Sequence, residues 1–191
     1  FNIATAHEEL GDYQDAITYY DKCVSYDPGY ADAWYALACC YDMIDAHALA
    51  LGAIQQAVEL VPEQIEYLQA KADVEYNLSY FAEAVATYLR IIELDPANVM
   101  SWYDYASLLQ EVNRPNQAIE AYLKVIEIDP MYADAYFELA TAYNAVGDTP
   151  NTLKALQKAF ELDEEKKQLF VEVFPNLYNL KVARNFLGIT D

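Results

Sequence analysis

The sequence predicts an all-α protein, built as a solenoid in which short antiparallel helix pairs stack along one axis. The first observation is a fixed period, because Pro28, Pro62, Pro96 and Pro130 stand 34 residues apart. The second is that apolar residues within each period follow helical spacing. The third is composition: 55% of the residues are hydrophobic, and only 5 are Gly and 7 are Pro. A disordered or linker-like chain is therefore excluded.

Each period contains two helices, A and then B. In the first half the apolar residues recur at i, i+3, i+4 and i+7, as in Trp34, Leu37, Ala38 and Tyr41. In the second half Ala50, Ile54, Ala57 and Val58 also lie on one helical face. The spacing predicts A helices near 31–44, 65–78, 99–112 and 133–146, and B helices near 14–27, 48–61, 82–95, 116–129 and 150–162.

The breaks between these helices carry turn residues, at 11–12 (GD), 113–115 (NRP) and 147–150 (GDTP). After residue 166 the period dissolves. Phe170, Val173, Phe174 and Leu177 form an apolar stripe that we expect to pack on the helix ending near Leu162. Pro175 can start a fresh helix, and Gly188 is a plausible helix stop. We expect residues 167–191 to cap the solenoid; the alternative is a docking helix for another domain or subunit.

The repeated phrases carry a specific resemblance. The pattern W-x2-L-A-x2-Y at 34–41, G-D-Y-x2-A at 11–16 and the closing D-P resemble the tetratricopeptide repeat (TPR) over about residues 1–166. The resemblance implies a right-handed superhelix with a partial repeat at 1–30 and full repeats at 31–64, 65–98, 99–132 and 133–166. Lys71, Pro115 and Thr152 depart from the usual Leu, Tyr and Ala, which predicts looser helix contacts locally.

The start of the chain falls inside a repeat, because Phe1 occupies the fifth position of one when the period is counted back from Pro28. We therefore expect a fragment of a longer TPR protein. No targeting segment precedes the repeats, so a cytoplasmic location is expected, with an upstream signal left open.

The charge of the chain is strongly negative. There are 31 acidic and 11 basic residues, a formal charge of −20. Residues 1–150 hold 25 acidic and 5 basic side chains, whereas residues 151–191 hold 6 of each. Nucleic acid and anionic membranes are poor partners for such a surface. No apolar run approaches the roughly 18 residues needed to span a bilayer.

Signatures of catalysis are missing from the sequence, and we expect no enzyme activity and no cofactor or metal. There is no glycine-rich phosphate loop, no HExxH and no GxSxG. His7 and His47 lie in separate repeats, and His7 occupies a packing position. Cys23, Cys39 and Cys40 fit neither a disulfide framework nor a zinc site, and a redox role for the adjacent pair is left open.

Binding is the function that the resemblance implies. In TPR proteins positions 2, 5, 6, 9, 12 and 13 of each A helix face a concave groove, and helical geometry places them opposite the packing stripe. Including the partial repeat, these positions hold ten acidic residues and no Lys or Arg. The candidate partner-binding residues are Asp32, Tyr35, Asp42, Glu66, Gln69, Asp73, Tyr76, Asn77, Tyr103, Asp104, Ser107, Glu111, Phe137, Glu138 and Asn144.

An acidic, aromatic-lined groove suits a partner protein or peptide that carries Lys or Arg. Asp73, Asp104, Glu111 and Glu138 are expected to share one stretch of groove with no cation beside them. TPR cochaperones hold acidic chaperone tails with Lys, Asn and Arg at these positions, so that kind of clamp is disfavoured here. Three alternatives stay open: a merely solubilising acidic surface, a substrate-recruiting segment of a larger enzyme, and self-assembly through the C-terminal cap. The partner's identity and the oligomeric state are not determined by the sequence.

Overall fold

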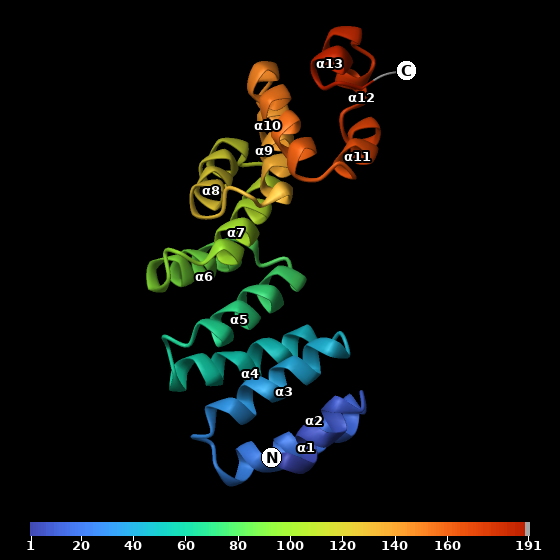
Figure 1. Cartoon of the computed structure of the whole chain (residues 1–191). Helices are drawn as coiled ribbons and strands as arrows, with labels where there is room; N and C mark the ends of the chain where they lie inside the picture. The colour runs from blue at the N-terminus through green and yellow to red at the C-terminus, as the bar shows by residue number, and fades with distance from the viewer. Residues whose placement is uncertain (190–191) are drawn as a thin grey trace. The chain divides into compact units, whose positions relative to one another are not determined.

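The computed structural model describes residues 1–189, which form helices and turns without a strand (Figure 1). Backbone contacts divide the chain into two units, Phe1–Pro96 and the residues from Ala97 onward. The first unit contains α1 (Asn2–Glu9), α2 (Tyr13–Tyr26), α3 (Ala31–Met43), α4 (His47–Leu60), α5 (Ile65–Asn77) and α6 (Phe81–Leu94). The second contains α7 (Val99–Glu111), α8 (Pro115–Ile128), α9 (Ala133–Ala145), α10 (Thr149–Leu162), α11 (Lys166–Val173), α12 (Pro175–Tyr178) and α13 (Lys181–Phe186).

The predicted fold class is confirmed: the described residues form an all-α array of helix pairs. Every A and B helix expected between residues 14 and 162 is present, with bounds that differ from expectation by at most one residue. The B helices α2, α4, α6, α8 and α10 begin 34 residues apart. Within each unit, consecutive helices contact one another, and so do α3 with α5 and α7 with α9.

Small residues on the B helices allow each pair to close. Ala16, Ala50, Ala84 and Ala118 recur once per period, and none of their surface is exposed. A methyl-sized side chain lets two helix axes approach closely, where a larger residue would hold them apart. Thr152 takes this position in α10, where it is fully buried and its hydroxyl donates to the Asp148 carbonyl at 2.8 Å.

The departure at Lys71 places a polar network between α5 and α6. Its ammonium group lies 3.1 Å from the carboxylate of Glu75, which is almost completely buried. The hydroxyl of Thr87 donates to the same carboxylate at 2.7 Å. These partners satisfy the buried charge, which would otherwise be costly, in place of the apolar contact that the usual Leu would make.

The turn from each A helix to its B helix repeats one backbone geometry. A residue with positive φ stands at the same place in all five turns, namely Gly11, Asp45, Ser79, Asn113 and Gly147. The amide of the next residue then bonds a carbonyl five residues earlier, as Tyr80 N–H does to Glu75 at 2.8 Å. This is the Schellman arrangement, which satisfies carbonyls at the helix end and reverses the chain.

Ser79 is the turn residue least suited to this geometry, because Asp and Asn tolerate the left-handed region better than Ser does. Its φ is 61°. We expect Ser79→Gly to raise the free energy of unfolding by about 1 kcal/mol, measured by urea denaturation. The reverse change, Gly11→Ala, should lower it by a similar amount through backbone strain alone, because nothing lies within 4 Å of the added methyl group. A destabilised Ser79→Gly protein would contradict this explanation.

The C-terminal segment covers the last helix pair with aromatic side chains. Phe170 is fully buried and packs edge-on against Phe160 of α10, with ring centroids 6.0 Å apart. Phe174 is also buried; its ring stacks on Phe170 at 5.9 Å and packs edge-on against Phe137 of α9 at 5.6 Å. The expectation for Val173 is wrong: as the last residue of α11 it is exposed to solvent.

The two backbone features expected in this segment are present. Pro175 is the first residue of α12. At this position the helix requires no backbone N–H donor, so proline costs no hydrogen bond. Gly188 has a φ of 67° directly after the end of α13, and the Ile189 amide bonds the Arg184 carbonyl at 2.9 Å. The chain therefore closes this segment with the same type of helix stop that it uses between A and B helices.

Phe170 is the residue on which this covering depends. Phe170→Ala should lower the free energy of unfolding by about 3–5 kcal/mol, because it removes a fully buried ring from a packed cluster. Val173→Ala, three residues further on, should change it by less than about 0.5 kcal/mol. Thermal and urea denaturation of both variants check this, and equal effects would show that the segment does not pack as described.

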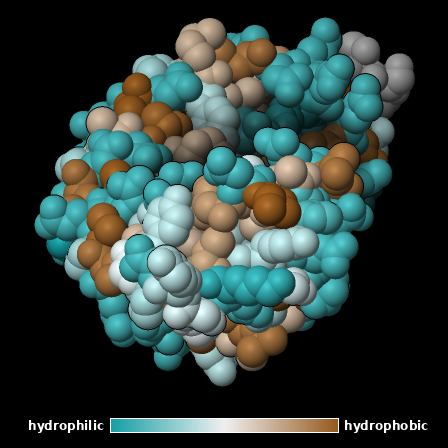
Figure 2. Space-filling model, turned by 90° about the horizontal axis from the view of Figure 1, so that it is seen from below, coloured by the Kyte–Doolittle hydropathy of each residue, from teal (hydrophilic) through white to brown (hydrophobic). Residues whose placement is uncertain are grey.

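Helix α1 packs mainly against α2. Ile3 on α1 and Leu10 just after it are largely exposed. Viewed from below the orientation of Figure 1, the surface shows separate hydrophobic residues among hydrophilic ones (Figure 2). Scattered apolar residues of this kind are ordinary on a protein surface.

Candidate protein-binding groove

A groove opens between α3 and α5, two A helices of the first unit that contact each other. Its volume is about 450 Å³. The lining residues recur at helical spacing, which places them on one face of each helix. They are Tyr35, Ala38, Cys39, Asp42 and Met43 on α3, and Glu66, Gln69, Ala70, Asp73 and Val74 on α5. We call this surface the α3–α5 groove.

An aromatic pair forms one part of this groove. The ring of Tyr35 stacks on Tyr67 with centroids 5.0 Å apart. The Tyr35 hydroxyl donates to Glu66 at 3.2 Å, and the Tyr67 hydroxyl donates to Asp32 through a short hydrogen bond. Burial raises the pKa of both tyrosines, and the neighbouring acidic groups raise it further. Both rings therefore stay neutral and are held in place before any partner arrives.

Hydrogen bonds from neighbouring side chains hold two carboxylates of the groove, Asp42 and Asp73, in place. Asp42 accepts hydrogen bonds from His47 Nδ1 at 2.7 Å and from the Asn77 amide at 3.1 Å. Asp73 accepts one from the Tyr88 hydroxyl at 3.3 Å. Burial raises the pKa of Asp73; the Tyr88 bond opposes this shift, and the negative charge of Asp42 adds to it. The two carboxylates are thus fixed in position, and their negative charges repel each other.

The basic residues of the first unit do not line the groove. There are three of them, Lys22, Lys71 and Arg90. Lys71 pairs with Glu75, Arg90 lies near Glu63 and Glu93, and the Lys22 ammonium sits 4.8 Å from the centre of the Tyr19 ring. The carboxylates of the groove therefore have no Lys or Arg of their own unit beside them.

The two adjacent cysteines are not activated as nucleophiles. Burial raises the pKa of Cys39 to about 11 and that of Cys40 to about 12. Both thiols are therefore protonated at neutral pH, and the thiolate is the reactive form. Cys39 contributes surface to the groove.

A second groove lies between α7 and α9 in the other unit, with a volume of about 440 Å³. It is lined by Tyr103, Ser107, Gln110, Glu111, Tyr122 and Glu138. The Gln110 amide donates to Glu138 at 3.2 Å. Burial raises the pKa of Glu138, although the Gln110 bond opposes that shift. We call this surface the α7–α9 groove.

The C-terminal segment changes this second surface in two ways. Lys166, the first residue of α11, forms a short ion pair with Asp134, and its charge favours the ionised form of Glu138. The expected absence of a cation near Glu138 is therefore wrong. Phe137 is only 4% exposed because Phe174 covers it, so its expected role as an open groove aromatic is wrong as well. Lys166 and Phe174 make these contacts from α11 and the residue that follows it, where the repeat pattern has ended and predicts no contacts.

The remaining predicted residues are distributed over both units. Asn77 donates to Asp42 of the groove, and Asp32 accepts from Tyr67, whose ring stacks on Tyr35 of the groove; neither Asn77 nor Asp32 lines the cavity. Tyr76 is partly exposed and packs edge-on against Phe81. Asp104 lies on α7 and raises the pKa of Tyr103 along with other acidic neighbours, whereas Asn144 is an exposed residue of α9. Asp73 belongs to the first unit, and Asp104, Glu111 and Glu138 belong to the second.

The role of the B-helix tyrosines at the groove was not predicted from the sequence. Tyr20, Tyr88 and Tyr122 are buried between helices, as expected for packing residues. Their hydroxyl groups reach the A-helix residue fifteen positions earlier: Thr5 at 3.2 Å, Asp73 at 3.3 Å and Ser107 at 3.1 Å. The sequence did contain a signal for these hydrogen bonds, because a polar residue stands fifteen positions before each of the three tyrosines.

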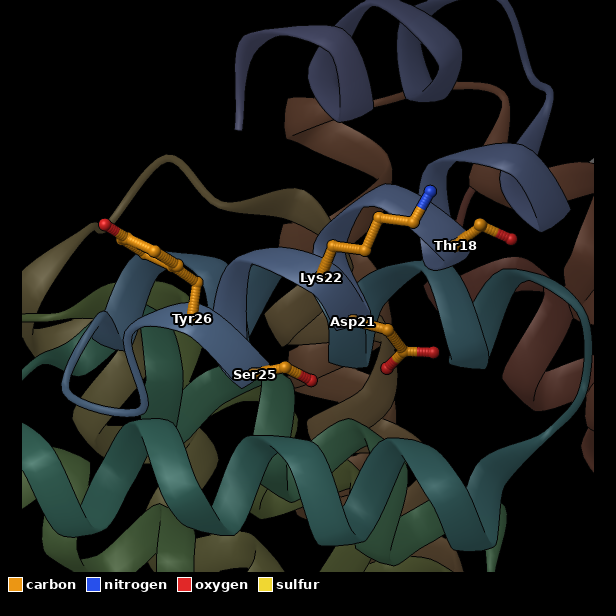
Figure 3. Close-up of a pocket in the computed structure, with 5 residues that line it drawn as sticks. All are labelled: Thr18, Asp21, Lys22, Ser25 and Tyr26. Atoms are coloured by element: carbon orange, nitrogen blue, oxygen red, sulfur yellow. The ribbon is translucent and has the colours of Figure 1, made fainter.

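Another hollow on the surface lies on a single helix. It has a volume of about 580 Å³ and is lined by Thr18, Asp21, Lys22, Ser25 and Tyr26, all from α2 (Figure 3). In the close-up, Tyr26 points away from Lys22 and Thr18. A shallow depression on a single B helix does not provide the facing walls of a binding site.

Stacked helix pairs with a groove between A helices define a class of protein, the helical-repeat interaction proteins. Family models described as tetratricopeptide or TPR repeats match residues 8–74, 65–98, 87–120 and 111–147. The chain belongs to the tetratricopeptide repeat family.

One curated relative is Hsp70-Hsp90 organizing protein 2 of Arabidopsis thaliana, 25% identical over 122 residues. The match covers 60% of this chain but spans only about a fifth of that relative, 21% of its length.

Solved structures show the same fold. A crystal structure of MamA is 24% identical, with a TM-score of 0.81 over 88% of this chain and 98% of that one. YrrB, described as a TPR protein with an unusual peptide-binding site, is 20% identical, with a TM-score of 0.78 over 94% of this chain and 90% of that one.

Two further properties concern residues 1–189. None of the helices in this range is long and apolar enough to cross a membrane. The same residues contain no group of three or more His, Cys, Asp and Glu side chains arranged to hold a metal ion.

The raised pKa of Asp73 means that this residue lowers the stability of the folded protein at neutral pH. An Asp that is harder to ionise in the folded state opposes folding at neutral pH, and this penalty disappears once the carboxyl is protonated in both states. Asp73→Asn should therefore raise the melting temperature at pH 7.

The difference in melting temperature between Asp73→Asn and the wild type should shrink as the pH falls through the raised pKa. It should vanish below the ordinary pKa of Asp, about 4. Thermal denaturation across pH measures it. A lower melting temperature for Asp73→Asn at pH 7 would contradict the assigned environment.

Proposed function

We propose that this chain is a non-catalytic interaction scaffold whose α3–α5 groove receives a partner segment carrying Lys or Arg. The TPR fold supports protein–protein interaction as the general function. The observation that supports the basic partner is the groove lining, in which three carboxylates occur without a Lys or Arg. A cationic side chain entering there would meet fixed acceptors and would relieve the repulsion between Asp42 and Asp73.

The aromatic and apolar part of the groove supplies contact area for the rest of the segment. Tyr35 is already held by Tyr67 and Glu66, so little of its conformational freedom is lost when a partner binds. Met43 is largely exposed and adapts easily to different apolar side chains. Affinity would then come mainly from these contacts, and the carboxylates would set the association rate and the choice of partner.

The first unit is favoured over the second as the place where a basic segment binds. In the α7–α9 groove, Lys166 already pairs with Asp134 and lies near Glu138. The ring of Phe137 is covered there too. In the α3–α5 groove Tyr35, the counterpart of Phe137, lines the cavity, and no Lys or Arg does.

The two similarities that name a binding role support this proposal only in part. YrrB is described as having a peptide-binding site, and the Arabidopsis thaliana relative is named as an organizer of two chaperones. An interaction scaffold is consistent with both. An acidic partner tail is disfavoured here, because it would meet three carboxylates and no Lys or Arg.

A charge-neutralising pair of substitutions tests the proposal. We expect Asp42→Asn with Asp73→Asn to weaken binding of a fluorescein-labelled peptide that alternates Lys and Leu by about 2- to 30-fold. This range corresponds to 0.2–1 kcal/mol for each exposed pair. Fluorescence anisotropy measures the affinity, and the wild-type affinity should fall as salt screens the charges.

The matched control removes the same charge from the B helices. Glu59→Gln with Glu83→Gln changes two exposed residues of α4 and α6 and should leave the affinity within about twofold. Equal weakening by both pairs, or binding that ignores salt, would mean that the acidic groove only keeps the protein soluble.

A further inference from the structure

The C-terminal segment carries a charge opposite to that of the remaining chain. Residues 166–191 hold four basic side chains (Lys166, Lys167, Lys181 and Arg184) and two acidic ones (Glu172 and Asp191), a net charge of +2. Residues 1–165 hold 29 acidic and 7 basic side chains, a net charge of −22. Two copies of the chain would therefore repel each other over most of their surfaces, whereas this segment would be attracted to an acidic surface.

The last helix of the segment also exposes apolar side chains. Val182 and Phe186 stand one turn apart on α13 and are 81% and 49% exposed. Ala183 on the adjoining side and the C-cap Leu187 are buried, so α13 is anchored while the face with Val182 and Phe186 is open. Lys181 lies beside Val182, is exposed, and forms no ion pair within residues 1–189. The exposed face of α13 thus combines an available cation with two large apolar side chains.

The α3–α5 groove has the complementary set of groups. It offers the carboxylates of Asp42, Glu66 and Asp73, with Tyr35 and Met43 as apolar contact surface. A cation with two neighbouring apolar groups is the chemistry that this groove is proposed to accept. Within the described chain, α13 presents these groups on one exposed face.

We propose that the α13 face of one copy binds the α3–α5 groove of a second copy. This inference rests on the proposed function, because it assigns a partner to the same groove. The two surfaces are different, so each contact joins α13 of one copy to the groove of another, and every copy carries both halves of such a contact. Head-to-tail contacts of this kind build rings or open chains.

Sedimentation velocity of the full chain over a concentration series tests the proposal. The average mass of the wild type should rise above 21.7 kDa with concentration at low salt and return to that value at high salt. A tail variant (Lys181→Glu with Val182→Asp) and a groove variant with reversed charge (Asp42→Lys with Asp73→Lys) should each stay monomeric, because like charges then face each other at the contact. Mixed in equal amounts, they should form pairs and nothing larger, because only one intact junction is available.

The mixing result also shows that both variants remain folded. As a matched control, Lys154→Glu with Leu123→Asp makes the same chemical change on the exposed sides of α10 and α8, and it should leave assembly unchanged. Assembly that survives in either monomer variant, or a mixture that stays monomeric, would overturn the proposal.

The same proteins separate this inference from the proposed function. The tail variant keeps an intact groove and should bind the Lys and Leu peptide with wild-type affinity. If the peptide binds while the wild type stays monomeric at every concentration, the self-association proposal is overturned and the proposed function stands. If neither binding nor assembly occurs, both are overturned.

Discussion

The close approach of each A helix to its B helix is the constraint on which the other features depend. Fully buried alanines recur once per period on the B helices, and a left-handed turn residue reverses the chain at the same place in every pair. With the pair closed, neighbouring A helices come into contact, as α3 and α5 do. The groove exists because its two walls are fixed by the packing on their opposite sides.

The packing tyrosines join the interior to the groove. Tyr88 has its ring between the helices and its hydroxyl on Asp73, and Tyr122 reaches Ser107 in the same way. A change in the core would therefore move groups that line the grooves. The cost of the site is visible in the carboxyl groups, since burial raises the pKa values of Asp73 and Glu138 and makes their ionised forms unfavourable. Stability given up at a surface of this kind is typical of binding sites.

The sequence predicted the helices almost completely because the 34-residue period repeats every signal several times. It also predicted which residues of α3 and α5 share a face, since that follows from helical geometry alone. It failed at Phe137 and Lys166, whose environments depend on the path of α11, where the repeat pattern has ended. The hydrogen bond from His47 to Asp42 was missed too, because it crosses a turn whose geometry is set by the positive φ of Asp45. The repeat pattern therefore predicts the helices and their faces, which all repeats share. It does not predict the contacts of single residues, which differ between the two grooves.

The central claim is that the A-helix face between α3 and α5 is where a basic partner segment binds. Backbone amide NMR of the isotope-labelled chain, titrated with the Lys and Leu peptide, tests it most directly because it reports the position of binding. We expect the shift changes to be concentrated at the residues that line the groove, Tyr35, Cys39, Asp42, Glu66 and Asp73 among them. Changes concentrated on the B helices α2 and α4, or no saturable change, would contradict the claim.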